Sequence, residues 1–173
     1  MAEEIKDPTH KFSDAVDGII RRIGHVLMWT NVVVIGLIIL QVILRYGFGH
    51  GLVILEELQW HFYGVGIMFG ISYAIMTDSH VGMDLVYERL SKKWKARWDI
   101  FGTVVLLLPF ACLICYQSLD FVYEAWRLGE RSVAPMGLCC RWAIKAVIPL
   151  SFALVILAAL SRLVRTIVIL RRA

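Results

Sequence analysis

Four segments of this sequence contain no aspartate, glutamate or arginine. They cover residues 24–44, 58–77, 100–119 and about 143–161, and Lys145 is the one charged residue in any of them. A helix of about 20 apolar residues is long enough to cross about 30 Å of hydrocarbon, and in lipid its backbone polar groups must pair within the helix. Hydrophobic residues make up 59% of the chain and the mean hydropathy is +0.70, which is high for a soluble domain. The sequence therefore predicts one all-α integral membrane domain with four transmembrane helices.

The sequence also lacks the common motifs of catalysis. It has no G-x-S-x-G motif, no glycine-rich phosphate loop and no Cys/His spacing typical of a metal site. His25 and His61 lie at opposite sides of the bilayer, whereas haem needs axial ligands at similar depth. The C-x-x-C of Cys112 and Cys115 falls inside an apolar segment, where cysteine behaves as a small hydrophobic residue. We expect neither enzymatic activity nor a cofactor, and a membrane redox protein with quinone or haem remains one alternative.

No acidic residue lies within the four apolar segments. Ionisable residues inside a membrane usually mark the path of an ion or substrate, and paired helix breaks mark transporter binding sites. The third and fourth segments each contain a single proline, Pro109 and Pro149. These segments therefore favour helix packing over transport by this chain alone, and an autonomous small exporter is the second alternative.

Charge distribution predicts the orientation of the chain. Thirteen lysine and arginine residues flank the segments on the side of both termini, and four lie on the other side. Because positively charged flanks stay in the cytoplasm, we expect both termini there. The net charge of +4 is thus explained by the lysine and arginine residues that flank the spans. Nucleic acid is not an expected partner. The first apolar run is too long for a cleavable signal peptide and is expected to remain as an anchor.

Aromatic residues and one lysine agree with these boundaries. Trp60 and Trp142 fall near the predicted outer ends of spans, and Trp94 and Trp98 fall near the inner ends. Tryptophan is enriched at the membrane–water interface. Lys145 lies close enough to a span end for its amine to reach the headgroups. We predict that these five residues anchor the protein at the membrane interfaces.

Two segments outside the spans have apolar residues on one helical face. They are residues 1–23, which lead into the first span, and residues 81–98, which follow the second. Such patterns are typical of amphipathic helices that lie on the inner membrane surface. Contact with anionic phospholipids and contact with a protein partner are both open interpretations.

Small residues recur every four positions in the second segment, at Gly66, Gly70 and Ala74. This small-xxx-small pattern allows two helices to approach closely in a membrane. The pattern indicates helix packing, within the chain or against another subunit.

Charged residues meet between the first two segments. Arg45 closes the first segment, and Glu56 and Glu57 precede the second. The three side chains either form an outer polar clamp that fixes the hairpin, or belong to a solvated turn. Cys139 and Cys140 are adjacent in the connection between the third and fourth spans, about 120–142, and their role is open.

Five short motifs lie on the predicted spans in a characteristic order. They are Arg45–Tyr46, Glu56–Glu57, residues 70–74 (GISYA), residues 80–84 (HVGMD), and Arg141–Trp142 with Lys145 and Ile148–Pro149. With the four-span pattern, they make the chain resemble the small membrane subunit of TRAP (tripartite ATP-independent periplasmic) transporters, of the DctQ type. The resemblance covers about residues 24–165.

The resemblance implies a non-catalytic subunit in the bacterial inner membrane. In that family a large membrane subunit carries the substrate with sodium ions, and a periplasmic binding protein delivers an organic anion. The small subunit supports the large one and helps to dock the binding protein. For this chain the resemblance further suggests that His80 and Asp84 cap the inner end of the second helix. The long connection at 120–142 departs from the shortest members of the family.

Overall fold

The computed structural model describes residues 8–77 and 91–172, and within these ranges all regular structure is helical. Helix α1 covers Pro8–Gly47 and α2 covers Val53–Met76. Helix α4 (Lys92–Phe101), a π-helical turn η1 (Gly102–Leu107) and α5 (Leu108–Arg127) continue one another as a single long rod. Helix α6 covers Arg141–Arg172. The four long helical rods confirm the predicted all-α class.

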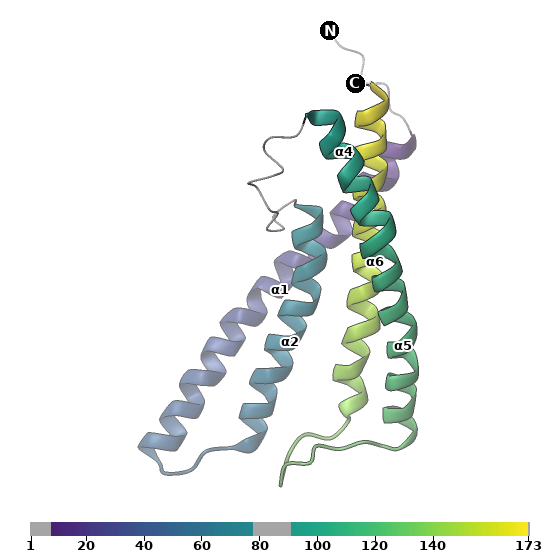
Figure 1. Ribbon diagram of the computed structural model, residues 1–173. Coiled ribbons are helices and arrows are strands. Elements are labelled where there is room, and N and C mark those ends of the chain that lie inside the picture. Colours follow the sequence, from purple (N-terminus) through teal and green to yellow (C-terminus); the bar gives the residue numbers. More distant parts are fainter. Residues whose placement is uncertain (1–7, 78–90, 173) are drawn as a thin grey trace.

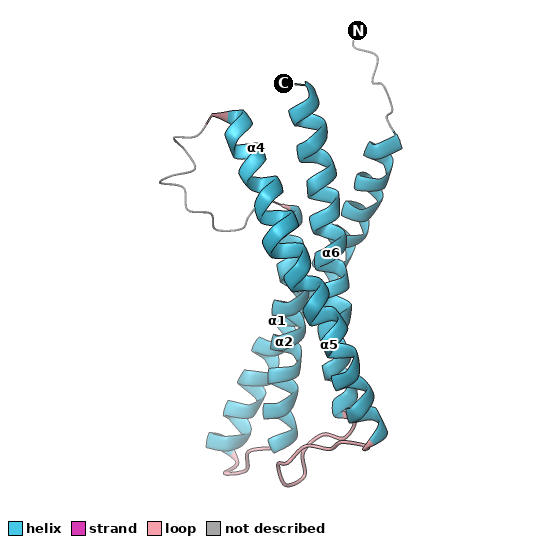
Figure 2. Cartoon of the chain, turned by 45° about the vertical axis from the view of Figure 1, so that its right-hand side comes forward, coloured by secondary structure: helices cyan, strands magenta, loops and turns pink. Residues whose placement is uncertain are grey.

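The rods form two antiparallel hairpins (Figure 1). Helices α1 and α2 make one hairpin through residues 48–52, and α5 and α6 make the other through residues 128–140, the α5–α6 loop. Both connections lie at one end of the molecule, the loop end, whereas the start of α1 and the end of α6 lie at the other, the terminal end (Figures 1 and 2). The hairpins meet near the middle of α6 and diverge toward the loop end.

A small apolar core holds the hairpins together where they meet. Ile20 of α1, Ile75 of α2 and Val155 of α6 are almost completely buried there, together with Val16, Ala111 and Ala158. Most other large apolar side chains, on α1 and α5 above all, face outward. An outward apolar surface of this kind is expected where lipid is the solvent.

The α5–α6 hairpin packs through small side chains. Ala111, Ser118 and Ala125 are buried on one face of α5 at intervals of seven residues. On α6, Ser151 and Ala159 are also buried. Small residues let two backbones approach closely, so the hairpin is held by dense van der Waals contact rather than by large interlocking side chains.

Three helical segments are long and apolar enough to span a membrane: Ser13–Gly47, Lys93–Arg127 and Arg141–Val168. They contain the first, third and fourth predicted spans. The second predicted span lies in α2, which is not among these three segments. The structure thus supports three of the four predicted spans by length and composition.

Several predicted boundaries differ from the observed ones. The third span was expected to end at residue 119, but the helix continues to Arg127, so the long connection shortens to residues 128–140. The predicted surface helix at 1–23 is, from Pro8 on, the start of α1 itself, and Val16 and Ile20 of its apolar face pack into the core. Of the predicted 81–98 helix, residues 81–90 lie outside the described residues, and the rest begins the α4–α5 rod.

Candidate functional site: polar contacts at the two ends of the bundle

Glu57 links the two hairpins at the loop end. It lies in the second turn of α2, where its carboxylate accepts a hydrogen bond from the main-chain N–H of Leu138 at 2.6 Å and another from the hydroxyl of Ser132. A Cβ on Gly137 would come within 2.8 Å of the Glu57 carboxylate, so this approach needs glycine. The hydrogen bonds from Ser132 and Leu138 lower the pKa of Glu57 below its ordinary value of 4.5.

A second acid, Glu130, organises the base of α6. It pairs with Lys145 and lies 3.7 Å from Arg141. The Lys145 amine also lies 3.8 Å from the centroid of the Phe121 ring on α5, a cation–π contact, and its side chain is only 13% exposed. Lys145 is therefore directed into the α5–α6 hairpin and not, as the sequence suggested, outward to the membrane interface.

The expected clamp of Arg45, Glu56 and Glu57 divides in two. Arg45 lies 4.0 Å from Glu56 with both side chains well exposed, a geometry that contributes little stability. Glu57 binds the α5–α6 loop instead. The stronger hairpin contact comes from Gln41, a buried residue of α1 that sequence analysis missed. Its amide donates to Glu56 at 3.1 Å and accepts from the N–H of Leu52 at 3.2 Å.

A buried polar cluster ties α1 to α6 at the terminal end. Asp17 pairs with Arg165 and accepts a hydrogen bond from Ser161 at 3.1 Å. Ser161 also lies 2.6 Å from Ser13, which accepts from Arg165 at 2.7 Å. Ser13 and Ser161 are 1% exposed and Asp17 is 8% exposed. Sequence analysis missed this cluster, because its members on α1 lie more than 140 residues from those on α6.

Gly66, Gly70 and Ala74 of α2 differ in what they contact within this chain. A Cβ on Gly66 would meet the Thr30 hydroxyl of α1 at 3.0 Å, so Gly66 faces the partner helix of its own hairpin. Gly70 is exposed with nothing within 4 Å, and Ala74 is half-buried. Sequence analysis also missed Gly24, where a Cβ would come within 2.5 Å of the Tyr73 ring.

Six further predicted residues are the four anchor tryptophans and the two expected caps. The four predicted anchor tryptophans, Trp60, Trp94, Trp98 and Trp142, are all exposed. His80 and Asp84, the expected caps, lie outside the described residues.

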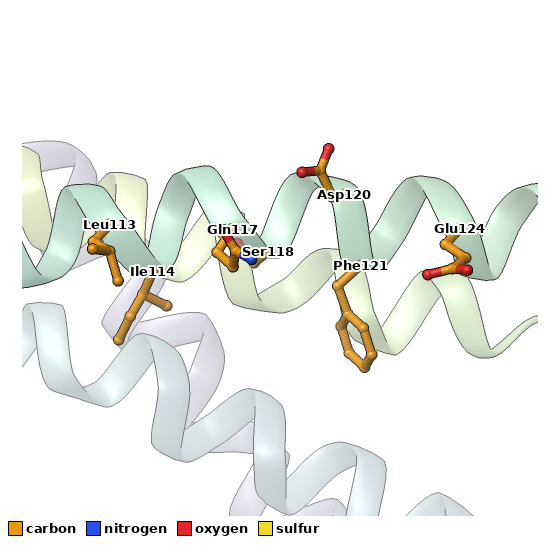
Figure 3. Close-up of a pocket in the computed structure, with 7 residues that line it drawn as sticks. All are labelled: Leu113, Ile114, Gln117, Ser118, Asp120, Phe121 and Glu124. Atoms are coloured by element: carbon orange, nitrogen blue, oxygen red, sulfur yellow. The ribbon is translucent and has the colours of Figure 1, made fainter.

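An open groove of about 500 Å³ follows the second half of α5 (Figure 3). Ile114 and Phe121 point to one side of the helix, whereas Asp120 points away from them. The lining residues are Leu113, Ile114, Gln117, Ser118, Asp120, Phe121 and Glu124. No group of three or more metal-ligating side chains occurs among the residues that the structure describes. The groove thus offers carboxylates and apolar surface, but no arrangement of nucleophile, base and orienting group.

The fold and these contacts define an all-helical membrane protein whose polar side chains hold its helices together. A family model described as "Tripartite ATP-independent periplasmic transporters, DctQ component" matches residues 34–168. The chain is also 29% identical over 103 residues to the C4-dicarboxylate TRAP transporter small permease protein DctQ of Pseudomonas aeruginosa. That match covers 57% of this chain and 47% of the relative, about half the relative's length.

The chain therefore belongs to the DctQ family, the small permease component of TRAP transporters. This confirms the resemblance that the short motifs indicated. It also confirms the prediction that the protein is a multi-pass, non-catalytic permease component and not an enzyme.

Proposed function

We propose that this chain is the small scaffold subunit of a sodium-coupled importer of an organic acid. It supports a large transport subunit and helps to dock a periplasmic binding protein. The observation that carries the proposal is that acidic side chains form contacts within the chain. Glu57, Glu130 and Asp17 each bind groups on another helix or loop of the same chain. Family membership supplies the tripartite context.

We further propose that all four rods cross the inner membrane. Helix α2 has 24 residues, and at about 1.5 Å per residue such a helix exceeds the hydrocarbon thickness. Its polar side chains already have partners: Gln59 donates to the carbonyl of Leu37 at 3.2 Å, and His61 lies 2.5 Å from the carbonyl of Glu57. A polar residue that is satisfied in this way is tolerated within a membrane helix.

The proposed orientation follows from the distribution of lysine and arginine. With the terminal end in the cytoplasm, the loop end and its Glu57 contact face the periplasm, where a binding protein would dock. Single cysteines introduced at His50 and at Lys93 test this, using a membrane-impermeant thiol reagent on intact cells. Labelling at residue 50 and protection at residue 93 is the expected result, and the reverse pattern would overturn the orientation.

The exposed side of α2 is the face that we propose for contact with the large subunit. Gly70 leaves open space there, flanked by the exposed Ile67 and Ile71. We expect Gly70→Leu to reduce co-purification with the large subunit in mild detergent. Gly36→Leu is the matched control, because Gly36 also lies exposed on a helix with nothing within 4 Å. Equal recovery for the two variants would exclude this face.

Reconstitution tests the function itself. We expect sodium-dependent uptake into liposomes only when this chain, the large subunit and the binding protein are all present. A four-carbon dicarboxylate is the first substrate to test, because the Pseudomonas aeruginosa relative is named for it. Uptake by this chain alone would instead support an autonomous transporter. Phospholipids are the remaining expected partners, around the outward apolar faces of α1 and α5.

A further inference from the structure

The α5–α6 loop ends in two adjacent thiols that its structural contacts do not use. Cys139 and Cys140 are both free and exposed, and their sulfur atoms lie 3.4 Å apart. The Cys140 S–H donates a hydrogen bond to the Cys139 sulfur. The other two cysteines, Cys112 and Cys115, lie within α5, and Cys115 donates to the carbonyl of Pro149. The adjacent pair is thus separate from the packing of the bundle.

The hydrogen bond distinguishes the two thiols chemically. A thiolate, not a thiol, is the nucleophile in thiol–disulfide exchange. The hydrogen bond to Cys139 raises the pKa of the Cys140 thiol above its ordinary value of 9.0. Because Cys140 is the donor of this hydrogen bond, Cys139 is the sulfur that attacks first and Cys140 the sulfur that reacts second.

We propose that Cys139 and Cys140 form a dithiol site that reduces small organic disulfides and closes into a disulfide between adjacent residues. The Cys139 thiolate attacks one sulfur of R–S–S–R, which forms a mixed disulfide and releases one RS⁻. Cys140 then loses its proton to water and attacks the Cys139 sulfur, which releases the second RS⁻. The chain loses two hydrogen atoms, and the organic disulfide is reduced to two thiols.

The position of this site couples it to the contact between the hairpins. Leu138, which binds Glu57, directly precedes Cys139, and Cys140 directly precedes α6. Bond formation must bring the sulfurs from 3.4 Å to covalent distance, while Cys140 already has a φ of 65° that side chains rarely adopt. The backbone that must move is the segment that holds Glu57, so oxidation weakens the Glu57–Leu138 hydrogen bond.

This inference goes beyond the proposed transport role, and its test needs neither a partner subunit nor a known orientation. The reduced, purified full-length chain in detergent is treated anaerobically with oxidised glutathione and then digested with trypsin. Cleavage after Arg131 and Arg141 gives a 132–141 peptide that contains both adjacent cysteines and neither of the α5 cysteines. The expected product is this peptide without two hydrogen atoms and without bound glutathione.

Two single variants test whether the internal disulfide needs both thiols. Cys140→Ser is expected to retain glutathione on Cys139, because the resolving thiol is gone. Cys139→Ser is expected to retain glutathione on Cys140 in the same way, because it also lacks a second thiol. A Cys112→Ser/Cys115→Ser variant is the control and should leave the 132–141 result unchanged.

Three results would overturn the proposal. They are persistent glutathione adducts on the wild-type peptide, disulfide-linked dimers as the main product, or glutathione on Cys140 instead of Cys139 when the wild-type reaction is quenched early with acid.

Discussion

The main-chain N–H of Leu138 donates a hydrogen bond to the Glu57 carboxylate over 2.6 Å, across 81 residues of sequence. The bond joins the start of α2 to the loop that leads into α6. Because the hairpins diverge toward this end, the apolar core near the middle of α6 cannot fix their separation there (Figure 2). Glu57 therefore sets the spacing of the hairpins where the bundle is most open.

Removal of this carboxylate should lower the thermal unfolding midpoint in detergent. We expect Glu57→Ala to have the larger effect, because it leaves the Leu138 N–H and the Ser132 hydroxyl without their acceptor. Glu57→Gln retains one acceptor oxygen and should lie between Glu57→Ala and wild type. Glu56→Gln is the control, since the Arg45–Glu56 pair is exposed. A midpoint for Glu57→Ala equal to that of the control would contradict the assigned role.

Acid should weaken the same contact. The pKa of Glu57 in the folded chain lies below the ordinary 4.5, so its ionised form binds better to the folded state. This contribution is fully present above the unfolded pKa of about 4.5 and is lost as the pH falls through the lower folded value. The midpoint of wild type is therefore expected to fall below about pH 4.5 more steeply than that of Glu57→Gln. Parallel pH profiles for the two proteins would contradict a stabilising role of the ionised Glu57 carboxylate.

The buried cluster at the terminal end should be more sensitive to substitution than its exposed surroundings. Asp17→Ala leaves Arg165 and Ser161 without their acidic partner, which should destabilise the fold by about 2 kcal/mol. Asp14→Ala, on the exposed face of the same helical turn, serves as the matched control. Denaturant unfolding in a fixed detergent measures both. A double-mutant cycle with Arg165→Ala should show non-additive losses, whereas simple additivity would mean that the two side chains act independently.

Two glycines of α1 should respond oppositely to the same substitution. Gly24→Ala places a methyl group 2.5 Å from the Tyr73 ring and should cost about 1–3 kcal/mol through overpacking. Gly18→Ala meets nothing within 4 Å and should stabilise the helix by up to about 1 kcal/mol. The difference in unfolding free energy between the two variants is the measurement. Stabilisation by both changes would mean that α1 and α2 lie farther apart than the structure shows.

The sequence predicted the features that depend on residues close together in the chain. Runs without charge located the helices, and Arg45, Glu56 and Glu57 were identified because they flank such runs. The small residues Ala111, Ser118 and Ala125 carried a signal that was missed, a spacing of seven that matches two turns of a helix.

Contacts that depend on tertiary structure could not be predicted. Asp17 lies in the segment 1–23 that was predicted as a surface helix and Arg165 lies beyond the fourth predicted span, and nothing near either residue in sequence indicates the pair. Likewise, Lys145 was read as an outward anchor because its distance from the span end permits that position. Only the length of α5 and the return of the loop place Glu130 within its reach.

The π-helical turn η1 rotates α4 relative to α5 about the axis of their common rod. A π-helical turn holds an additional residue, so the two halves of the α4–α5 rod are rotated relative to each other by about the 100° that one residue subtends. Deletion of a single residue within Gly102–Leu107 would restore a uniform α-helix and turn α4 about its axis. Asp99, which lies 4.0 Å from Arg162 of α6, would then swing away, while the Ala111–Ser118–Ala125 face stayed in place. The extra residue thus acts as an angular spacer that lets one continuous rod present two differently oriented faces to the same neighbour.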